Sequence, residues 1–494
     1  MFCDESEDVA RKATRVITRP KYVRIQPTTS GQVQYEFIDC TDEIVSGLPI
    51  REQIIARSRS RSGTPPGRPP TFARDDLAMG LFFTHYIVKP NNFASLLPSN
   101  EVATQAMYSG MKAVGLGGLA AFTRDERMRK EAMQQYTSAI ALTNVAIQSI
   151  ETAKLDSTLL TVLLLSTFES MASDSPRSLD YWINHINGAA SLLNLRSYSD
   201  LANPHTARLC IQVAAHLQIL CLLQGVHLPP VILDQQRFFA QFVRTEDPVW
   251  RYQTYIVRLT NFRAGLKQGI IHDRTHILAE CSTLDALFAS LYPDRYQPGH
   301  SFEIVETTDD DEAFYSGKYH IYENEMAHLN WNGIRCMRIL INEMILEYLP
   351  KQPITQHQDQ AAQTMQVLQE LQDGILSSVP QSLGRTGSTT QSLKNSQADK
   401  TNDSQLRMTF PWLNFENNHF NLTSPRESSP LPWIRLWGGY TIMWPLYTAG
   451  SMLGASESSI KYAIEALRVY HRQTGAQQAA YFAHALEKKI QIHN

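Results

Sequence analysis

Apolar side chains recur at three- and four-residue steps along most of the chain after residue 77. Such spacing places them on one face of an α-helix. It predicts amphipathic helices within residues 131–151, 334–348 and 460–470, the last of them ending before Gly475, a residue suited to a left-handed helix cap. Within 131–151 the predicted apolar face consists of Tyr136, Ala139, Ile140, Thr143, Ile147 and Ile150.

The sequence predicts an all-α fold, a large multi-helix domain. No matching series of alternating, β-branched segments joined by tight Asn-Gly or Asp-Gly turns indicates β-hairpins. The longest apolar stretches, 159–168 and 217–226, are near ten residues, whereas a bilayer span needs about 20. We therefore interpret both stretches as buried helix faces and expect no membrane association.

Two polar segments interrupt the helical pattern. Residues 1–75 are polar and end in a stretch rich in Arg, Ser and Pro, and polar side chains dominate from residue 384 until apolar density returns at Leu431. Proline fixes φ and removes a hydrogen-bond donor, so such a stretch is typical of a linker. We predict a disordered N-terminal segment and linker (1–75), a helical domain in two parts (76–383 and 431–494) and a disordered low-complexity insertion (384–430).

The N-terminal linker contains a basic segment. Six arginines face one acidic residue, Glu52, between residues 51 and 74, and the candidate functional side chains are Arg57, Arg59, Arg61 and Arg68. A nuclear import signal and a phosphate-contacting arm both suit this pattern. A solvated linker that can be phosphorylated explains the same residues, so all three interpretations stay open.

The composition narrows the class of protein. Of 494 residues, 43% are hydrophobic and 19% charged, which is typical of a globular chain with a core. The 45 basic and 48 acidic residues leave a net charge of −3, so no molecule-wide positive field attracts nucleic acid. Six scattered cysteines without a Cys-x-x-Cys pair argue against a disulfide scaffold, and the acidic start is unlike a secretory signal.

No pattern for metal chemistry is complete. The acidic run 309–312 lacks the Asp-Asp-x-x-Asp spacing with which a terpene-synthase-like enzyme holds magnesium, so we interpret it as a surface loop. The fifteen histidines include no His-Glu-x-x-His pair. Histidines that occur singly in helical segments are expected to be core or interhelical residues with hydrogen-bond partners, namely His85, His185, His216, His328 and His484.

Two glycine-containing segments also fail as catalytic motifs. The segment 450–454 lacks the glycine two residues before Ser451 that a nucleophile elbow requires. The segment 115–118 follows no predicted strand and lacks Gly-Lys-Ser/Thr, so close helix packing or a helix break explains it better than a phosphate loop. We predict that the chain is not an enzyme, with no catalytic, cofactor-binding or metal-binding residues of its own.

Residues 181–196 form the most distinctive helical stretch. One predicted face carries Trp182, His185, Ile186, Ala189, Leu192 and Leu193, and the adjacent Gly188 leaves room for another helix to approach closely. We interpret this stretch as a packing element.

In order and spacing, four passages across about residues 77–490 resemble the regulatory, or middle homology, region of fungal zinc-cluster (Zn2Cys6) transcription factors. The resemblance implies an all-α regulatory domain. The passages are 81–86 with 96–98 and 113–116; 159–169 with Trp182, His185, Gly188, Ala189, Leu192, Leu193 and Arg196; Trp331, Asn332, Arg335, 338–340, Asn342 and Glu343; and 444–447 with 449–451.

One departure from that family concerns its DNA-binding module. Members of the family normally begin with six cysteines that hold two zinc ions, whereas the first 80 residues here contain only Cys3 and Cys40. Two thiolates cannot build that cluster. We therefore expect that the chain resembles a family member entered after its DNA-binding module. Either the gene model is shortened or the product is spliced, or the chain is a paralogue without the cluster. Zinc is expected only if an upstream six-cysteine module exists.

The resemblance implies a nuclear transcriptional regulator of the fungal, RNA polymerase II type. Its expected partners are the transcriptional machinery or related zinc-cluster factors, through a homo- or heterodimer, and we expect no sequence-specific DNA binding by this chain alone. An alternative is a cluster-less interaction protein that heterodimerises with full-length relatives. The other alternative, an α-helical enzyme, would need convergent carboxylates or a nucleophile pair, which the sequence does not reveal.

Overall fold

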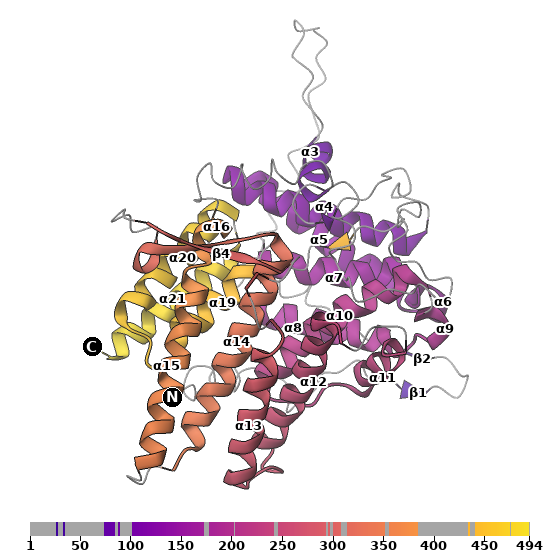
Figure 1. Cartoon of the computed structure of the whole chain (residues 1–494). Helices are drawn as coiled ribbons and strands as arrows, with labels where there is room; N and C mark the ends of the chain where they lie inside the picture. Colours follow the sequence, from indigo (N-terminus) through magenta and orange to yellow (C-terminus); the bar gives the residue numbers. More distant parts are fainter. Residues whose placement is uncertain are drawn as a thin grey trace, which may run out of the picture.

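The computed structural model of the chain describes residues 74–83, 101–171, 177–201, 203–241, 246–292, 295–296, 300–307, 314–350, 355–383, 440–474 and 476–493, and the short strands 26–27, 33–34, 87–88 and 433–434 (Figure 1). Most of these residues are helical, so the predicted all-α fold class is confirmed. Three segments discussed above lie outside the described residues. They are the basic segment with Arg57, Arg59, Arg61 and Arg68, the acidic run 309–312 and the insertion 384–430.

The helices of the first half follow one another through short connections. They are α3 (Arg74–Leu81), α4 (Val102–Thr123), α5 (Glu126–Ala146), α6 (Ile150–Ala153), α7 (Asp156–Met171), α8 (Ser178–Leu193), α9 (Tyr198–Leu201), α10 (Pro204–Gln224) and α11 (Pro230–Phe239). Helix α4 packs against α3, α5 and α7, and α7 also packs against α8. Figure 1 shows α3, α4, α5 and α7 grouped at one end of the molecule.

The second half contains the longest helix of the described residues. Its helices are α12 (Pro248–Lys267), α13 (Arg274–Ala289), α14 (Glu325–Tyr348), α15 (Thr355–Leu376), α16 (Val379–Ser382), α19 (Tyr440–Ser451), α20 (Glu457–Thr474) and α21 (Gln477–His493). In Figure 1 the helices α12 to α15 extend toward the end opposite α3, and α19 to α21 lie beside them.

Side-chain caps define where several helices begin. The carboxylates of Asp125, Asp247 and Asp273 accept hydrogen bonds from backbone N–H groups in the first turns of α5, α12 and α13. The amide oxygen of Asn324 accepts the N–H of Ala327 at 2.8 Å in the same way at the start of α14. These caps satisfy donors that have no partner inside the helix.

Strands are few and short among the described residues. They form three antiparallel pairs, β1 (Gln26–Pro27) with β2 (Val33–Gln34), β3 (Ile87–Val88) with β6 (Trp433–Ile434), and β4 (Phe302–Glu306) with β5 (Lys318–Tyr322). In the longest pair Phe302 lies opposite Tyr322 and Glu306 opposite Lys318. The sequence predicted no hairpin, and the β4–β5 pair corrects that expectation. The pair gives no tight-turn signal, because eleven residues connect its two strands.

Both predicted helical parts contribute to the largest hydrophobic core. It contains side chains from α3 to Leu486 of α21. A second core joins α12, α13 and part of α14, and a third, small core consists of Phe302, Tyr322 and Ala327 with Trp331 packed against it. Helix α14 contributes to all three, through Ile339, Ile341 and Ala327 respectively. The helix therefore connects the separate packing regions of the molecule.

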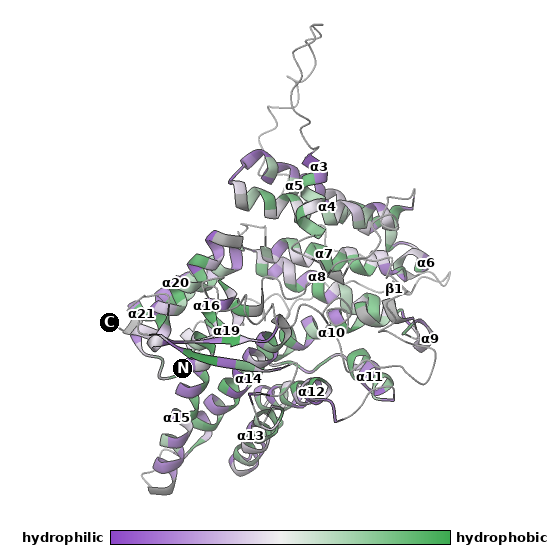
Figure 2. Ribbon diagram, turned by 45° about the horizontal axis from the view of Figure 1, so that its top comes forward, coloured by the Kyte–Doolittle hydropathy of each residue, from purple (hydrophilic) through white to green (hydrophobic). Residues whose placement is uncertain are grey.

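Several local predictions hold. Of the apolar stretches predicted as buried helix faces, 159–168 lies inside α7, and 217–226 lies in α10 up to its end at Gln224; most of their side chains are buried. Within the described residues no helix is both long and apolar enough to cross a membrane. Figure 2 shows hydrophilic and hydrophobic residues mixed on most helices, as amphipathic helices require. The segment 115–118 lies inside α4, and a β-carbon on Gly115 would come within 2.1 Å of the Ala78 oxygen. Close packing therefore explains Gly115, and the alternative of a helix break is wrong because α4 continues through the segment.

Candidate functional site

A row of polar residues runs along one face of α14 just after the β4–β5 hairpin. His328, Asn332 and Arg335 are spaced by four and three residues, so their side chains lie on the same face of the helix. All three are buried. Buried polar groups must be satisfied by partners, so this face is the natural place to look for a function.

Arg335 lies at the centre of this row. Its Nη1 donates hydrogen bonds to the Tyr322 hydroxyl at 2.5 Å and to the Asn332 amide oxygen at 2.8 Å. The guanidinium carbon is 5.4 Å from the ring centre of Phe302, 5.5 Å from that of Trp331 and 5.9 Å from that of Tyr322. The faces of aromatic rings attract cations at such distances, so the three rings help to hold the charge.

No carboxylate neutralises Arg335 within the described part of the chain. The residue is 6% exposed, yet it forms no ion pair there, and its Nε and Nη2 donate no hydrogen bond there. Ion pairs on the adjoining elements involve other residues, Lys318 with Asp373 at 3.7 Å and Arg338 with Asp285 at 2.8 Å. Arg335 is therefore a buried cation that lacks the usual counter-charge.

Gly374 of α15 makes room for the guanidinium. A β-carbon at this position would lie 2.6 Å from Arg335 Nε and 3.0 Å from its Cζ. Real β-carbons do not approach other heavy atoms so closely, so a larger residue would displace the side chain. The absence of a side chain at Gly374 thus allows the guanidinium to pack directly against α15.

The two histidines of the site are neutral at pH 7. Burial and the nearby Arg335 charge lower the pKa of His328 to about 4 and that of His320 to about 2. The Nε2 atom of His328 lies 2.9 Å from the Ser382 hydroxyl and 3.2 Å from the Asn332 amide nitrogen. Since neither ring carries charge, Arg335 is the cation around which the cluster is built.

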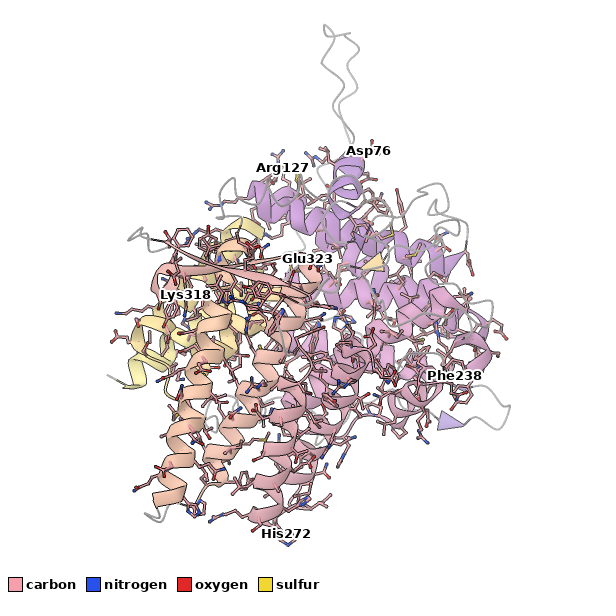
Figure 3. All side chains as sticks on the ribbon, in the orientation of Figure 1. Asp76, Arg127, Phe238, His272, Lys318 and Glu323 are labelled. Carbon is pink, nitrogen blue, oxygen red and sulfur yellow. The ribbon has the colours of Figure 1, made fainter. Side chains whose placement is uncertain are left out.

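The hairpin is held over this cluster by α15 and α16. The backbone N–H of His320 donates to the Ser377 oxygen at 2.8 Å. The side chain of Gln381 accepts from the Tyr322 N–H at 2.7 Å and donates to the Tyr322 oxygen at 3.0 Å, as a neighbouring strand would. Figure 3 labels Lys318 and Glu323 at the two ends of β5, which lies across the ends of α14 and α15. We call Arg335, Tyr322, Asn332, Trp331 and Phe302 the Arg335 cluster.

The Arg335 cluster has the groups for binding an anion and lacks those for acid–base chemistry. An arginine stays protonated at any pH that leaves the fold intact and presents donors in a planar fork that suits carboxylates and phosphates. His320 and His328 are too weakly basic to take up a proton near pH 7. In the described residues no group of three or more His, Cys, Asp or Glu side chains could hold a metal ion.

A second polar centre lies between α5, α7 and α8. The Tyr136 hydroxyl donates to Glu169 Oε1 at 2.5 Å and lies 2.9 Å from His185 Nε2. Tyr136 and Glu169 are each 2% exposed, and burial lowers the pKa of His185 to about 4. A tyrosine, a glutamate and a histidine are groups that enzymes use, but a centre this enclosed gives a substrate no access. We assign it to the packing of the three helices.

The structure accounts for several residues that carried the sequence resemblance. The predicted face of 181–196 is buried in α8, and its Arg196 donates to the Asp156 carboxylate of α7 at 2.9 Å. His185, His216 and His328 are core histidines with hydrogen bonds, as predicted, whereas His484 is exposed and lies 3.4 Å from Glu487. His85 lies outside the described residues.

Sequence reasoning did not identify the Arg335 cluster as a site. The signal that could have found it was the spacing of His328, Asn332 and Arg335, which places three polar side chains on one face of a helix. The cluster also needs Phe302 and Tyr322 from the unpredicted hairpin. The candidate residues Arg57, Arg59, Arg61 and Arg68 cannot be placed relative to it, because they lie outside the described residues.

Comparison with known protein families gives a match for the first helical part. Residues 83–324, just under half of the chain, match the family described as the fungal specific transcription factor domain. No zinc-cluster domain is found in the chain by the same comparison. No curated protein and no solved structure matches the chain. The matched region begins two residues after α3, contains α4 to β5, and ends at Asn324, the residue before α14.

Proposed function

We propose that the chain is a regulator of RNA polymerase II transcription that acts in the nucleus through its helical domain, because residues 83–324 match the fungal specific transcription factor domain. The observation that supports the proposal is the family match over α4 to β5, together with a helical architecture that continues through α21. The family is one of transcription factors and is not a known enzyme family.

We propose that the domain works through contacts between helices and a partner protein. Helix α14 joins the three hydrophobic cores, so a change at one core alters the packing of the others. The partners would be the transcriptional machinery or related zinc-cluster factors, engaged as a homo- or heterodimer. Sequence-specific DNA contact would come from a zinc-cluster module outside the sequence described here, since Cys3 and Cys40 alone cannot form one.

A tethering experiment tests the regulatory role. The full chain is fused to a heterologous DNA-binding domain, and expression of a reporter gene with the matching site is measured in a fungal cell. The proposal expects at least a severalfold change in expression relative to the DNA-binding domain alone. The chain is fused at either end of the DNA-binding domain. If neither fusion changes reporter expression, although both accumulate in the nucleus, the proposal is contradicted.

Two further measurements separate the alternatives. If the chain heterodimerises with full-length relatives, co-expression with such a relative should recover a complex by affinity capture and lower the reporter output driven by that relative. If the basic segment directs import, replacing Arg57, Arg59, Arg61 and Arg68 with Gln should shift a fluorescent fusion from the nucleus to the cytoplasm. Unchanged nuclear signal in that variant removes the import role but leaves the regulatory one.

A further inference from the structure

Two buried arginines of the molecule differ in how their charge is met. Arg196, whose side chain is 1% exposed, forms an ion pair with Asp156 at 2.9 Å, and Thr206 donates to the other oxygen of that carboxylate. Arg335 is nearly as buried but has no carboxylate among the described residues. Burial of a charge is costly unless an opposite charge compensates it. The Arg335 cluster thus lacks one component that the Arg196 pair has.

The free donors of the two arginines also differ in access. Arg196 Nε and Nη1 lack hydrogen-bond partners and are enclosed completely, so no ligand can reach them. Arg335 Nε and Nη2 also donate no hydrogen bond within the described residues, but unlike the Arg196 atoms they are not completely enclosed. Both atoms therefore keep some contact with solvent, while the guanidinium packs against the α15 backbone at Gly374. Two adjacent N–H groups of one guanidinium form the fork that binds a carboxylate in bidentate fashion.

The surroundings of the fork favour an organic anion over an inorganic one. The rings of Phe302, Trp331 and Tyr322 lie within 6 Å of the guanidinium carbon, and the ring of His320 is neutral. A single cation flanked by apolar ring surface suits one carboxylate on an apolar body, whereas phosphate carries more charge and attracts several donors. Lys318 is already engaged with Asp373 at 3.7 Å and does not add a second free cation.

We propose that the Arg335 cluster is a binding site for a small organic carboxylate. The carboxylate would accept hydrogen bonds from Arg335 Nε and Nη2, and its apolar part would lie against the aromatic rings of the cluster. Because the cluster joins β4 and β5 to α14 and α15, an occupied site would hold the hairpin more firmly to the helices. The inference deepens the proposed regulatory function by naming the class of its effector.

Binding is tested on the purified full chain, without DNA or reporter. Titration calorimetry and thermal unfolding are run with sodium benzoate, succinate, acetate and inorganic phosphate at constant ionic strength set with chloride. We expect at least one of the two larger carboxylates to raise the unfolding temperature and to bind at least about tenfold more tightly than acetate or phosphate. Fluorescence of Trp331, which lies beside the guanidinium, should change with the same midpoint.

Two variants locate the site and one serves as control. Arg335→Met should weaken carboxylate binding by about tenfold or more, because charge-assisted hydrogen bonds are lost. Gly374→Ala keeps the charge but displaces the guanidinium, so it should weaken binding as well. Arg258→Met removes one positive charge at a half-exposed pair with Glu280 and should leave binding unchanged. Circular dichroism verifies that each variant is folded.

The outcomes decide the proposal. Equal binding by wild type and a folded Arg335→Met variant would overturn it, as would tighter binding of phosphate than of benzoate and succinate, or no binding of any anion at millimolar concentration. None of these results bears on the tethered reporter, so loss of the ligand proposal and loss of the regulatory proposal can be told apart.

Discussion

Glu343 of α14 and Leu453, 110 positions later in the sequence, are joined by a hydrogen bond. The backbone N–H of Leu453 donates to Glu343 Oε1 at 2.7 Å, just after the end of α19. Lys489 of α21 donates to the Ser451 oxygen at 2.7 Å in the same place, where a cation suits the carbonyl end of a helix. The end of α19 is thus held by a carboxylate from α14 and an ammonium group from α21.

Glu343 should make stability depend on pH near neutrality. The side chain is 8% exposed, and burial raises its pKa from 4.5 to about 7, although Lys489 and Arg263 oppose the shift. Because the folded-state value is the higher one, the contribution to stability is complete below pH 4.5 and is lost as pH rises to about 7. Replacing Glu343 with Gln abolishes this loss. Between pH 4.5 and 8 the free energy of unfolding of the variant should therefore rise relative to that of wild type by on the order of 3 kcal/mol.

The measurement is denaturant unfolding at a series of pH values for both proteins. Glu347 lies one turn further along α14 and is exposed, so Glu347→Gln is the matched control and should follow the wild-type curve. A difference between Glu343→Gln and wild type that stays constant across this pH range would contradict the assignment.

The two buried arginines should respond differently to substitution. Arg196→Met leaves Asp156 without its counter-charge, and breaking such a pair costs about 3 to 5 kcal/mol. Arg335→Met leaves no uncompensated carboxylate within the described residues and loses only two hydrogen bonds and the ring contacts, so about 1 to 2 kcal/mol is expected. Urea unfolding of the two variants gives both values, and a larger loss for Arg335→Met would show that its charge is compensated after all.

The sequence revealed the helices well because their signal is local. The face of 181–196 and most of the stripe within 131–151 are buried as the periodicity predicts, since a three- to four-residue step determines which side chains face the core. The exception is Ile150, which is 43% exposed. Local residues also excluded a phosphate loop at Gly115, because Gly-Lys-Ser/Thr is missing, and they left close packing or a helix break as the explanation. These conclusions required no knowledge of which helix lies next to which.

The Arg335 cluster could not be predicted because its parts come from separate elements. Arg335 and Asn332 share a helix, but Tyr322 belongs to a hairpin and Gly374 to the next long helix, so only the tertiary fold brings them together. The hairpin lacked the signal of a tight turn, because a connection of eleven residues separates β4 from β5. Whether a carboxylate compensates the charge of Arg335 is likewise known only once the positions of its neighbours in the fold are known.

His185 should contribute to unfolding in acid. Burial lowers its pKa from 6.5 to about 4, so the folded-state value lies below the unfolded one. Its contribution is present above pH 6.5 and is lost as pH falls toward 4, with a size on the order of 3 kcal/mol. His185→Gln keeps a group that can bond to Tyr136 but cannot take up the proton, and the exposed His484→Gln is the control. Unfolding followed between pH 7 and 4 should show a shallower loss for His185→Gln alone; parallel curves for all three proteins would refute the role.

The packing of α3 on α4 should depend on the missing side chain of Gly115. Its ideal β-carbon would lie 2.1 Å from the Ala78 oxygen, a backbone atom that cannot rotate away, so Gly115→Ala must separate the two helices. We expect a loss of about 2 kcal/mol, because the cost of overpacking exceeds the helix-propensity gain of about 1 kcal/mol. Gly80→Ala in α3 meets nothing within 4 Å and should be neutral or slightly stabilising, which makes it the matched control. Thermal unfolding distinguishes them: equal midpoints for the two variants would mean that α3 is not docked against Gly115.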